Sequence, residues 1–304
     1  IDEIKFVHPK DVQDGEVEVT ENDILTNLPY ALGAHHRLQD SVAVSGDGRA
    51  WYLINASPDI RAQLLGTPEL RPGPGLRETP VRGVLLTTAE LDHTIGLLSL
   101  REAVSLVVYA TTAVTTALAP LRALLAAYSN VEWRELPAEL DLDGGLKVRR
   151  LTVGAKRPRY AAEASGDDWV SALRLSPAPP NSDRRSAQRT DASAVARGDR
   201  IRTQRSYTNR SFVYATCLPA WTEEFHRFIA GADEVLLDGT FQTDDELTRM
   251  TGRPGSAASM GHLPMAESRG HFARHPGTRF RFGHLNNTND AAGPDVAEDG
   301  IELI

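Results

Sequence analysis

Short runs of β-forming residues recur along the chain, and this recurrence constrains the fold more than any other feature. The runs are rich in Val, Leu, Ile and aromatic residues, and turn residues separate them, as is typical of strands. Nine such runs occupy residues 40–45, 51–55, 81–87, 104–110, 146–153, 169–176, 211–216, 233–239 and 278–285. The early runs are mostly neighbours, whereas the later ones follow single helices. A doubly wound parallel sheet would alternate strand and helix throughout, so the pattern predicts an α+β fold with two sheets packed face to face and helices outside.

Three segments carry helical periodicity, with apolar residues spaced three and four apart. They are residues 57–66, 111–129 and 220–234. In the first, Ser57 is placed to cap the helix, Pro58 to occupy its first position and Gly66 to end it. Because no domain-sized linker interrupts the pattern, residues 1–304 are predicted to form a single domain.

The formal net charge of −8 argues against a general nucleic-acid binder, because affinity for phosphate depends on clustered cations. One stretch differs: residues 181–210 carry eight Arg against three Asp. It could be a patch for an anionic partner, but its few large apolar residues favour a flexible Arg-rich insertion at about 178–208.

No apolar stretch approaches the roughly 18 residues that span a bilayer. The segment at the start of the chain is acidic and mixed in character, unlike a secretion signal. We therefore expect a cytoplasmic protein with no membrane partner. The single cysteine, Cys217, excludes an intrachain disulfide and a cysteine-based zinc cluster, so a metal site must be built from His and carboxylates.

The stretch "VRGVLLTTAELDHTIGLLSL", residues 81–100, places Asp92 and His93 between the end of an apolar strand and the start of a helical pattern. Rigid strands often hold the loops that present reactive groups. An Asp-His pair by itself is also compatible with a helix cap and an ordinary loop histidine. The pair therefore indicates a metal site only if other ligands meet it.

The last third of the chain supplies such groups at further element ends. Asp238 ends one strand-like run, His262 precedes a helix, and His284 ends another strand-like run. Together they indicate a metal or acid–base site, although Asp238 could cap a helix and His262 could bind a buried carbonyl. The nearby side chains of Asn286, Asn287 and Asn289 could hold the loop or the substrate's polar groups.

Five segments in the same order resemble one family. They read "LINASPDIRAQL", "TAELDHTIGLLSLRE", "GADEVLLDGTFQTDDEL", "MGHL" and "HLNNTN", and they are similar to the coenzyme pyrroloquinoline quinone biosynthesis protein B (PqqB) family of the metallo-β-lactamase superfamily. The resemblance runs from about residue 38 to the end of the sequence and is poor between about 105 and 210. It implies an αββα sandwich of two mixed sheets, in agreement with the strand pattern.

The resemblance also implies a reduced metal site. Superfamily hydrolases carry His-x-His-x-Asp-His in this loop, whereas here Thr88 and Glu90 stand at the first two His positions. Asp92 and His93 remain, and His284 matches the last metal-binding His. Two imidazoles and one carboxylate compose the ligand set of non-haem Fe(II) oxygenases, although the same ligands accept zinc or manganese. Fe(II) is therefore the expected cofactor and O2 the expected co-substrate.

Members of this family resemble iron-dependent hydroxylases that act on a tyrosine ring. The resemblance implies an amino-acid-derived, tyrosine-like substrate, linked to a peptide or carrier, in cofactor or natural-product biosynthesis. His262 and Asp238 would serve as acid–base or supporting groups near that substrate, with His262 the better proton carrier.

The chain departs from the family before residue 38, where it lacks the glycines and the Cys-x-Cys-x-x-Cys zinc motif. His35 and His36 lie in this altered segment. Two other functions therefore stay open. One is a zinc hydrolase in which Glu90, His35, His36 or Cys217 completes a second site. The other is a non-catalytic scaffold that binds a partner through the Arg-rich insertion.

Overall fold

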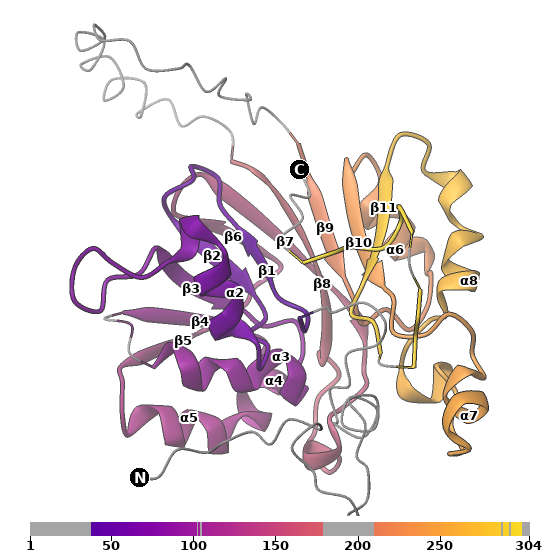
Figure 1. Cartoon of the computed structure of the whole chain (residues 1–304), viewed down its shortest axis with the longest axis horizontal. Coiled ribbons are helices and arrows are strands. Elements are labelled where there is room, and N and C mark those ends of the chain that lie inside the picture. Colours follow the sequence, from indigo (N-terminus) through magenta and orange to yellow (C-terminus); the bar gives the residue numbers. More distant parts are fainter. Residues whose placement is uncertain are drawn as a thin grey trace, which may run out of the picture.

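The structure is a computed structural model that describes residues 38–101, 103, 105–178, 210–286, 288–291 and 293–299. Two β-sheets form the centre of this part of the chain (Figure 1). The first sheet has the order β1 (Val42–Val44), β2 (Trp51–Ile54), β3 (Val81–Leu85), β4 (Leu106–Ala110) and β5 (Val131–Glu135). The second has the order β11 (Arg279–Gly283), β10 (Glu234–Asp238), β9 (Phe212–Ala215), β8 (Val170–Pro177), β7 (Leu146–Gly154) and β6 (Glu139–Leu142).

Both sheets are mixed. In the first, β1 pairs antiparallel with β2, and β2 to β5 run parallel. In the second, β9, β10 and β11 run parallel, and β6 to β9 pair antiparallel. The parallel strands of each sheet deliver their carboxyl ends to one edge of that sheet, and the loops that carry the predicted site residues begin there.

Helices connect the strands, and those in the described part of the chain are all short. The α-helices are α2 (Ile60–Gly66), α3 (Leu91–Thr94), α4 (Thr112–Ala117), α5 (Ala119–Ala126), α6 (Glu223–Ile229), α7 (Glu246–Thr251) and α8 (Met265–Arg269). The 3₁₀ turns are η2 (Pro68–Leu70), η3 (Ile95–Leu100), η4 (Arg159–Ala161), η6 (Ala258–Met260) and η7 (Phe272–Arg274). Among the residues described, none of these helices combines the length and the apolar character needed to cross a membrane.

Three apolar clusters hold the layers together. Side chains of both sheets form the middle cluster, for example Ile54 and Leu85 from the first sheet and Leu173 and Tyr214 from the second. Because successive side chains of a strand point to opposite faces, the neighbouring Leu53 belongs instead to the outer cluster with the helices.

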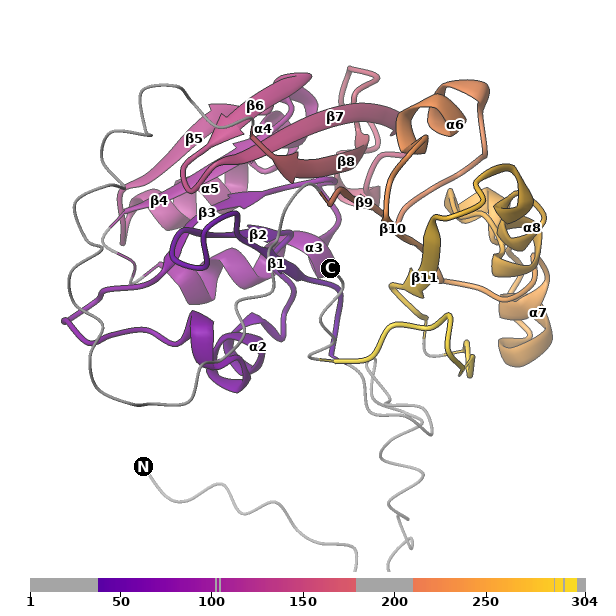
Figure 2. The same ribbon diagram turned by 90° about the horizontal axis from the view of Figure 1, so that it is seen from above.

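The outer clusters cover the remaining faces of the sheets. In one outer cluster, side chains of α2, η3, α4 and α5 pack against the first sheet. In the other, side chains of α6 and α8 pack against the second sheet. Figure 2 shows the two groups of helices on opposite sides of the paired sheets. The arrangement confirms the predicted αββα sandwich.

All nine predicted runs form strands, but the sequence pattern misses β5 and β6. Both are edge strands, each at the end of its sheet. The sequences "VEWRE" and "ELDL" are rich in acidic residues, because an edge strand needs little apolar surface and charged side chains protect it against further pairing.

Two helix predictions need correction. The helix predicted to begin at Pro58 starts at Ile60, with Asp59 at the N-cap position, so Ser57 lies too far before the helix to cap it. The Ser57 hydroxyl donates instead to the Gln63 side chain at 3.0 Å. The predicted end at Gly66 is confirmed. The long segment 111–129 forms α4 and α5 rather than one helix, with a break at Leu118. Pro120, which has no amide hydrogen, lies in the first turn of α5.

The Arg-rich insertion lies outside the described residues except for Ala178, so its flexibility and any anionic partner stay predictions. The single-domain organisation of residues 1–304 likewise stays a prediction.

Gly96 brings the loop that carries Asp92 and His93 against the loop that follows β2. The Ala56 amide donates to the His93 carbonyl at 2.7 Å, and the Gly96 amide donates to the Ala56 carbonyl at 3.0 Å. A Cβ on Gly96 would lie 2.0 Å from the Ser57 carbonyl oxygen and 2.7 Å from that of Ala56. Only glycine permits this approach, so Gly96 sets the position of the predicted ligand loop.

We predict that Gly96→Ala lowers the free energy of unfolding by about 3 kcal/mol, because backbone must move to admit the methyl group. Chemical denaturation of the metal-free protein measures the change. Gly66→Ala is the matched control: a Cβ there meets nothing within 4 Å, and the change should stay within about 1 kcal/mol. Equal stability of the two variants would contradict the packing argument.

Candidate metal centre

The predicted site residues lie where strands of both sheets end. The first sheet contributes Asp92 and His93, on α3 after β3. The second contributes Cys217 shortly after β9, Asp238 as the last residue of β10, and His284 directly after β11. The structure thus brings together side chains that are far apart in the sequence, as the constellation predicts.

His93 is fully buried and is oriented by Thr88. The Thr88 hydroxyl contacts Nδ1 of His93 at 2.9 Å and accepts a hydrogen bond from the Glu90 amide at 3.1 Å. Burial lowers the pKa of His93, against the opposing charge of Asp92, so the ring is neutral at physiological pH. Nε2 of His93 is buried without a hydrogen-bond partner among the described residues. Such a nitrogen is a suitable metal ligand.

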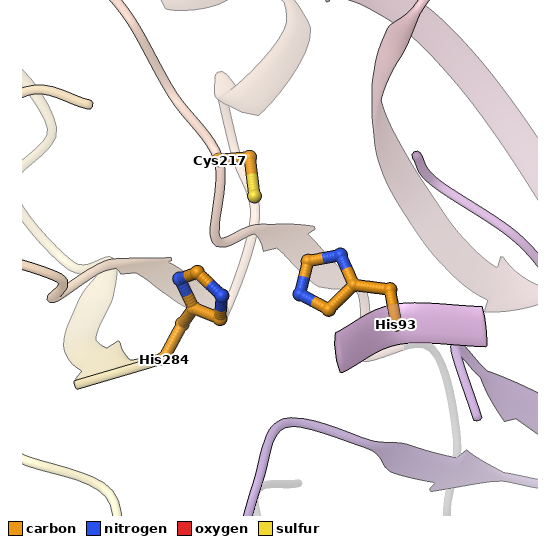
Figure 3. Close-up of side chains that lie close together, drawn as sticks. All are labelled: His93, Cys217 and His284. Carbon is orange, nitrogen blue, oxygen red and sulfur yellow. The ribbon is translucent and has the colours of Figure 1, made fainter. Parts of the chain in front are cut away.

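Cys217 and His284 face this free nitrogen (Figure 3). One ligand atom from each of His93, Cys217 and His284 lies within 4.8 Å of the others. The ring centroids of His93 and His284 are 4.8 Å apart. Burial, followed by the charges of Asp238, Asp92 and Asp40, raises the pKa of Cys217 well above its ordinary value, so it is a thiol in the absence of a cation.

Asp92 pairs with His284. Its Oδ2 lies 3.1 Å from Nε2 of His284, and 41% of its side-chain surface is exposed, which marks the open side of the site. Burial alone would lower the pKa of His284, but the hydrogen bond and charge of Asp92 raise it to about 9. Burial alone would raise the pKa of Asp92, but its electrostatic interaction with the neighbouring His93 and its contact with His284 hold that pKa well below its usual value.

Asp238 is fully buried, and both of its oxygens already accept hydrogen bonds. Oδ2 accepts from the Leu218 amide at 3.0 Å and from Nδ1 of His262 at 2.8 Å. Oδ1 accepts from the amide and the hydroxyl of Thr240, at 3.1 and 2.6 Å. Asp238, His262 and His284 also form a group whose ligand atoms lie within 4.8 Å of one another.

The Thr240 hydroxyl links the two groups. It contacts Nδ1 of His284 at 2.9 Å and Nδ1 of His262 at 3.0 Å, in addition to Asp238. A hydroxyl has one hydrogen, which goes to the short, charged contact with Asp238. Thr240 therefore accepts from Nδ1–H of His284. Nε2 of His284 then faces the Asp92 carboxylate and needs a proton or a cation between them.

The structure places the remaining predicted residues elsewhere. Neither Glu90 nor Asp92 belongs to the two ligand groups found in the described chain. Asp92 reaches the site through His284, whereas the Glu90 carboxylate lies 3.8 Å from Lys156. Asn286 and Asn289 hold the loop after β11: the Asn286 amide donates to the Thr240 carbonyl, and the Asn289 side chain donates to the Gly239 carbonyl at 2.6 Å. Asn287, His35 and His36 lie outside the described residues.

The sequence pattern does not anticipate Asp40 or the linking role of Thr240. The Asp40 carboxylate is 5% exposed and lies 3.9 Å from Nε2 of His93. It accepts hydrogen bonds from the hydroxyls of Tyr214 and Thr216. An Asp just before a strand is an ordinary turn residue, so the local sequence carries no signal for this placement.

Comparisons with known proteins agree with the fold. The model of the beta-lactamase superfamily domain matches residues 50–284. Coenzyme PQQ synthesis protein B of Methylobacterium nodulans is 34% identical over 286 residues, which cover 88% of this chain and 87% of the relative. The protein of the same name from Xanthomonas oryzae is 32% identical over 292 residues, covering 90% and 89%.

Two solved structures are also similar. The crystal structure of Zn(2+)-bound PqqB from Methylobacterium extorquens has a TM-score of 0.71 and 28% identity, and 92% of each chain is covered. A diphosphatase of the PhnP family, with a TM-score of 0.57 and 17% identity over 88% of this chain and 86% of its own, shares the fold. By the extent of these matches, the chain belongs to the coenzyme PQQ synthesis protein B family of the beta-lactamase superfamily.

Proposed function

We propose that the protein is a mononuclear non-haem iron oxygenase that hydroxylates an amino-acid-derived substrate in the biosynthesis of a cofactor or natural product. Asp92, His93 and His284 would hold the metal. The observation that carries the proposal is the unpartnered, buried Nε2 of His93, which lies in one cluster with Cys217 and His284. Asp92 lies outside that cluster and would join it through its contact with Nε2 of His284 at 3.1 Å.

The residues present fit a metal ion. A buried nitrogen without a partner costs about 1–3 kcal/mol in a folded protein, and a metal bound at Nε2 of His93 would remove this penalty. The contact between Asp92 and His284 supplies the second reason, since a cation can replace the proton between them. Thr88 and Thr240 fix the two rings through Nδ1, as supporting groups commonly do for metal-binding histidines.

Two imidazoles and one carboxylate are the donor set that holds non-haem Fe(II) in oxygenases and leaves positions open for O2 and substrate. Zinc or manganese can occupy the same ligands. The exposed side of Asp92 provides the direction from which a substrate reaches the site.

The hydrogen bonds of Asp238 favour one metal over two. Its two oxygens accept four hydrogen bonds, so binding a second ion would break several of them. His284 is common to both ligand groups, and only its Nε2 is free to bind, because Nδ1 donates to Thr240.

His262 is the proposed proton carrier. Its Nδ1–H donates to Asp238 at 2.8 Å, which fixes the tautomer and leaves a lone pair on Nε2. The ring stacks near His284, with centroids 5.7 Å apart. His262 could therefore accept the proton of a phenol bound beside the ligands, and Asp238 would hold the imidazolium that results. A tyrosine-like substrate, linked to a peptide or carrier, suits this arrangement.

The relatives support a biosynthetic role, since their name assigns them to coenzyme PQQ synthesis. The second candidate function is a zinc hydrolase. It is favoured by the group of Asp238, His262 and His284, and by the zinc ion in the similar PqqB structure. A scaffold that binds through the Arg-rich insertion is a third proposal, which rests on the sequence alone. We expect no nucleic acid or membrane partner.

We predict that His93→Ala and His284→Ala abolish iron retention. After anaerobic reconstitution with Fe(II) and gel filtration, the unmodified protein should hold about one iron per chain, and each variant close to none. Metal analysis gives the stoichiometry. His271→Ala is the control, because His271 stacks on Trp221 outside both ligand groups. Full iron retention in either site variant would overturn the proposal.

His262→Gln separates the two candidate functions. In a mononuclear centre this variant should keep its metal, while O2 consumption with a tyrosine-containing peptide falls by about 10²- to 10⁴-fold, the usual contribution of general acid–base catalysis. In a dinuclear zinc enzyme, the same substitution should remove one of two zinc ions per chain. Metal content and turnover, measured on the same sample, decide between them.

Metal affinity should rise with pH because the metal displaces a proton from His284. The pKa of His284 is raised to about 9, so the apparent affinity for Fe(II) should increase about tenfold per pH unit from 6.5 to 8.5 and then level off. Asp92, with its lowered pKa, stays ionised throughout. Anaerobic titrations at several pH values test this, and a flat profile would contradict it.

The stability of the metal-free protein should fall as pH rises, whereas its metal affinity should increase. A histidine whose pKa rises from 6.5 to about 9 on folding stabilises the protein below pH 6.5 and loses that contribution as pH rises through 9. Asp92→Asn should remove most of this pH dependence in thermal melts.

A further inference from the structure

Lys156 lies between the loops that carry the proposed metal ligand Asp92 and the proposed proton carrier His262. On one side, its Nζ lies 3.8 Å from Oε1 of Glu90, which closely precedes Asp92 in the sequence. On the other side, its aliphatic stem packs against Gly261, the residue before His262. A Cβ on Gly261 would lie 2.5 Å from Cδ of Lys156. Lys156 therefore connects the two loops at the site.

The charge of Lys156 also acts on the interior of the site. Burial and three nearby carboxylates raise the pKa of Cys217, and the positive charge of Lys156 acts against them. Cys217 belongs to the ligand group of His93 and His284. Because the Lys156 side chain is also 37% exposed, the same ammonium group is open to solvent. It is placed to meet a molecule that enters the site.

The ammonium group of Lys156 has hydrogen-bonding capacity to spare. It carries three donors, and its distance of 3.8 Å to Glu90 is longer than a hydrogen bond. Both side chains are about a third exposed, and such an ion pair contributes little to stability. A carboxylate from a ligand can therefore accept hydrogen bonds from Lys156 without breaking one that the described residues make.

The neighbouring cation, Arg157, has a different role. Its guanidinium donates to the carbonyls of Ala162 and Gly166 at 3.3 and 3.4 Å. It also lies over the ring of Trp169, 5.9 Å from the ring centroid. Arg157 thus stabilises its own loop, whereas Lys156 contacts the loops of the site.

The loop that carries Lys156 is fixed at both ends. The hydroxyl of Tyr160, on η4, donates to the Ala89 carbonyl in the ligand loop. At the end of β7, Gly154 packs on the loop after β9, and a Cβ there would lie 3.3 Å from Cγ of Pro219. A cation on a loop held in this way is preorganised for a ligand.

We propose that Lys156 binds a carboxylate of the substrate at the open side of the metal centre, so that the substrate is an amino-acid derivative with a free carboxylate. This inference rests on the proposed function and narrows its substrate class. The carboxylate is the anionic group of such a substrate, and a compact ammonium group binds it as a point charge. A link to a peptide or carrier would then run through the amino group. The substrate carboxylate would replace Glu90 as the partner of Lys156.

The test measures binding to the metal-free protein, in which a carboxylate cannot bind a metal instead. The probes are N-acetyltyrosine, which has a free carboxylate, and N-acetyltyrosinamide, which has a neutral amide in its place. In isothermal titration calorimetry, the unmodified protein should bind the acid about tenfold more tightly than the amide, because hydrogen bonds to charged groups are stronger than neutral ones.

Lys156→Met should remove this preference. It should lower the affinity for the acid about tenfold and leave the affinity for the amide unchanged, because Met keeps an apolar stem but lacks the charge. The matched control is Lys147→Met, at the opposite end of β7, where Nζ of Lys147 pairs with Glu139 at 2.9 Å. This variant should bind both probes as the unmodified protein does.

Glu90→Gln should act in the opposite direction. It removes the carboxylate that competes for Lys156, so the affinity for the acid should rise several-fold. A purely structural role of the ion pair predicts effects of the same sign in both variants. The inference fails if the unmodified protein does not prefer the acid, which includes finding no binding of either probe, or if Lys156→Met keeps the preference.

The two proposals fail separately. Lys156→Met should still hold about one iron per chain, because Lys156 is not a metal ligand. If His93→Ala and His284→Ala lose iron while Lys156→Met keeps the preference for the acid, the iron centre stands and only the carboxylate site is lost. If both histidine variants retain iron while Lys156→Met loses the preference, Lys156 binds carboxylates but the proposed iron centre is wrong.

Discussion

The packing of the two sheets against each other is the constraint on which the site depends. Asp92 and His93 follow β3 of the first sheet, whereas Cys217 and His284 follow β9 and β11 of the second sheet and Asp238 ends β10. The shared apolar cluster between the sheets sets the distance between these two groups. Close packing of that cluster, and of Gly96 against the loop after β2, gives the ligand atoms separations suitable for an ion without a covalent crosslink.

Hydrogen bonding divides the polar groups of the site into two kinds. Asp238 has no acceptor capacity left to spare, and through His262 and Thr240 it orients the neighbouring rings. His93 has a free Nε2, and His284 faces a carboxylate across a gap that requires a positive charge. The satisfied groups support the site and the unsatisfied ones are available for a ligand, which is why we propose one metal rather than two.

Much of the fold could be predicted because it follows from local patterns. The nine strong β-runs and the end of α2 at Gly66 reflect apolar spacing and a glycine stop. The edge strands β5 and β6 have weak apolar patterns, and they form because each pairs with a neighbouring strand in the folded protein. The predicted cap at Ser57 was wrong because α2 begins at Ile60, with Asp59 rather than Ser57 at the N-cap position.

The sequence by itself determined which chemical groups are available and that they stand at the ends of strands. Asp92, His93, Asp238, His262 and His284 could be identified from it, because strand ends and helix starts have local signatures. Only the tertiary structure decided which groups meet. Asp92 and His284 are 192 positions apart, and Asp40 reaches His93 from a different strand end. Such distances depend on how two sheets pack, and no local propensity encodes that packing.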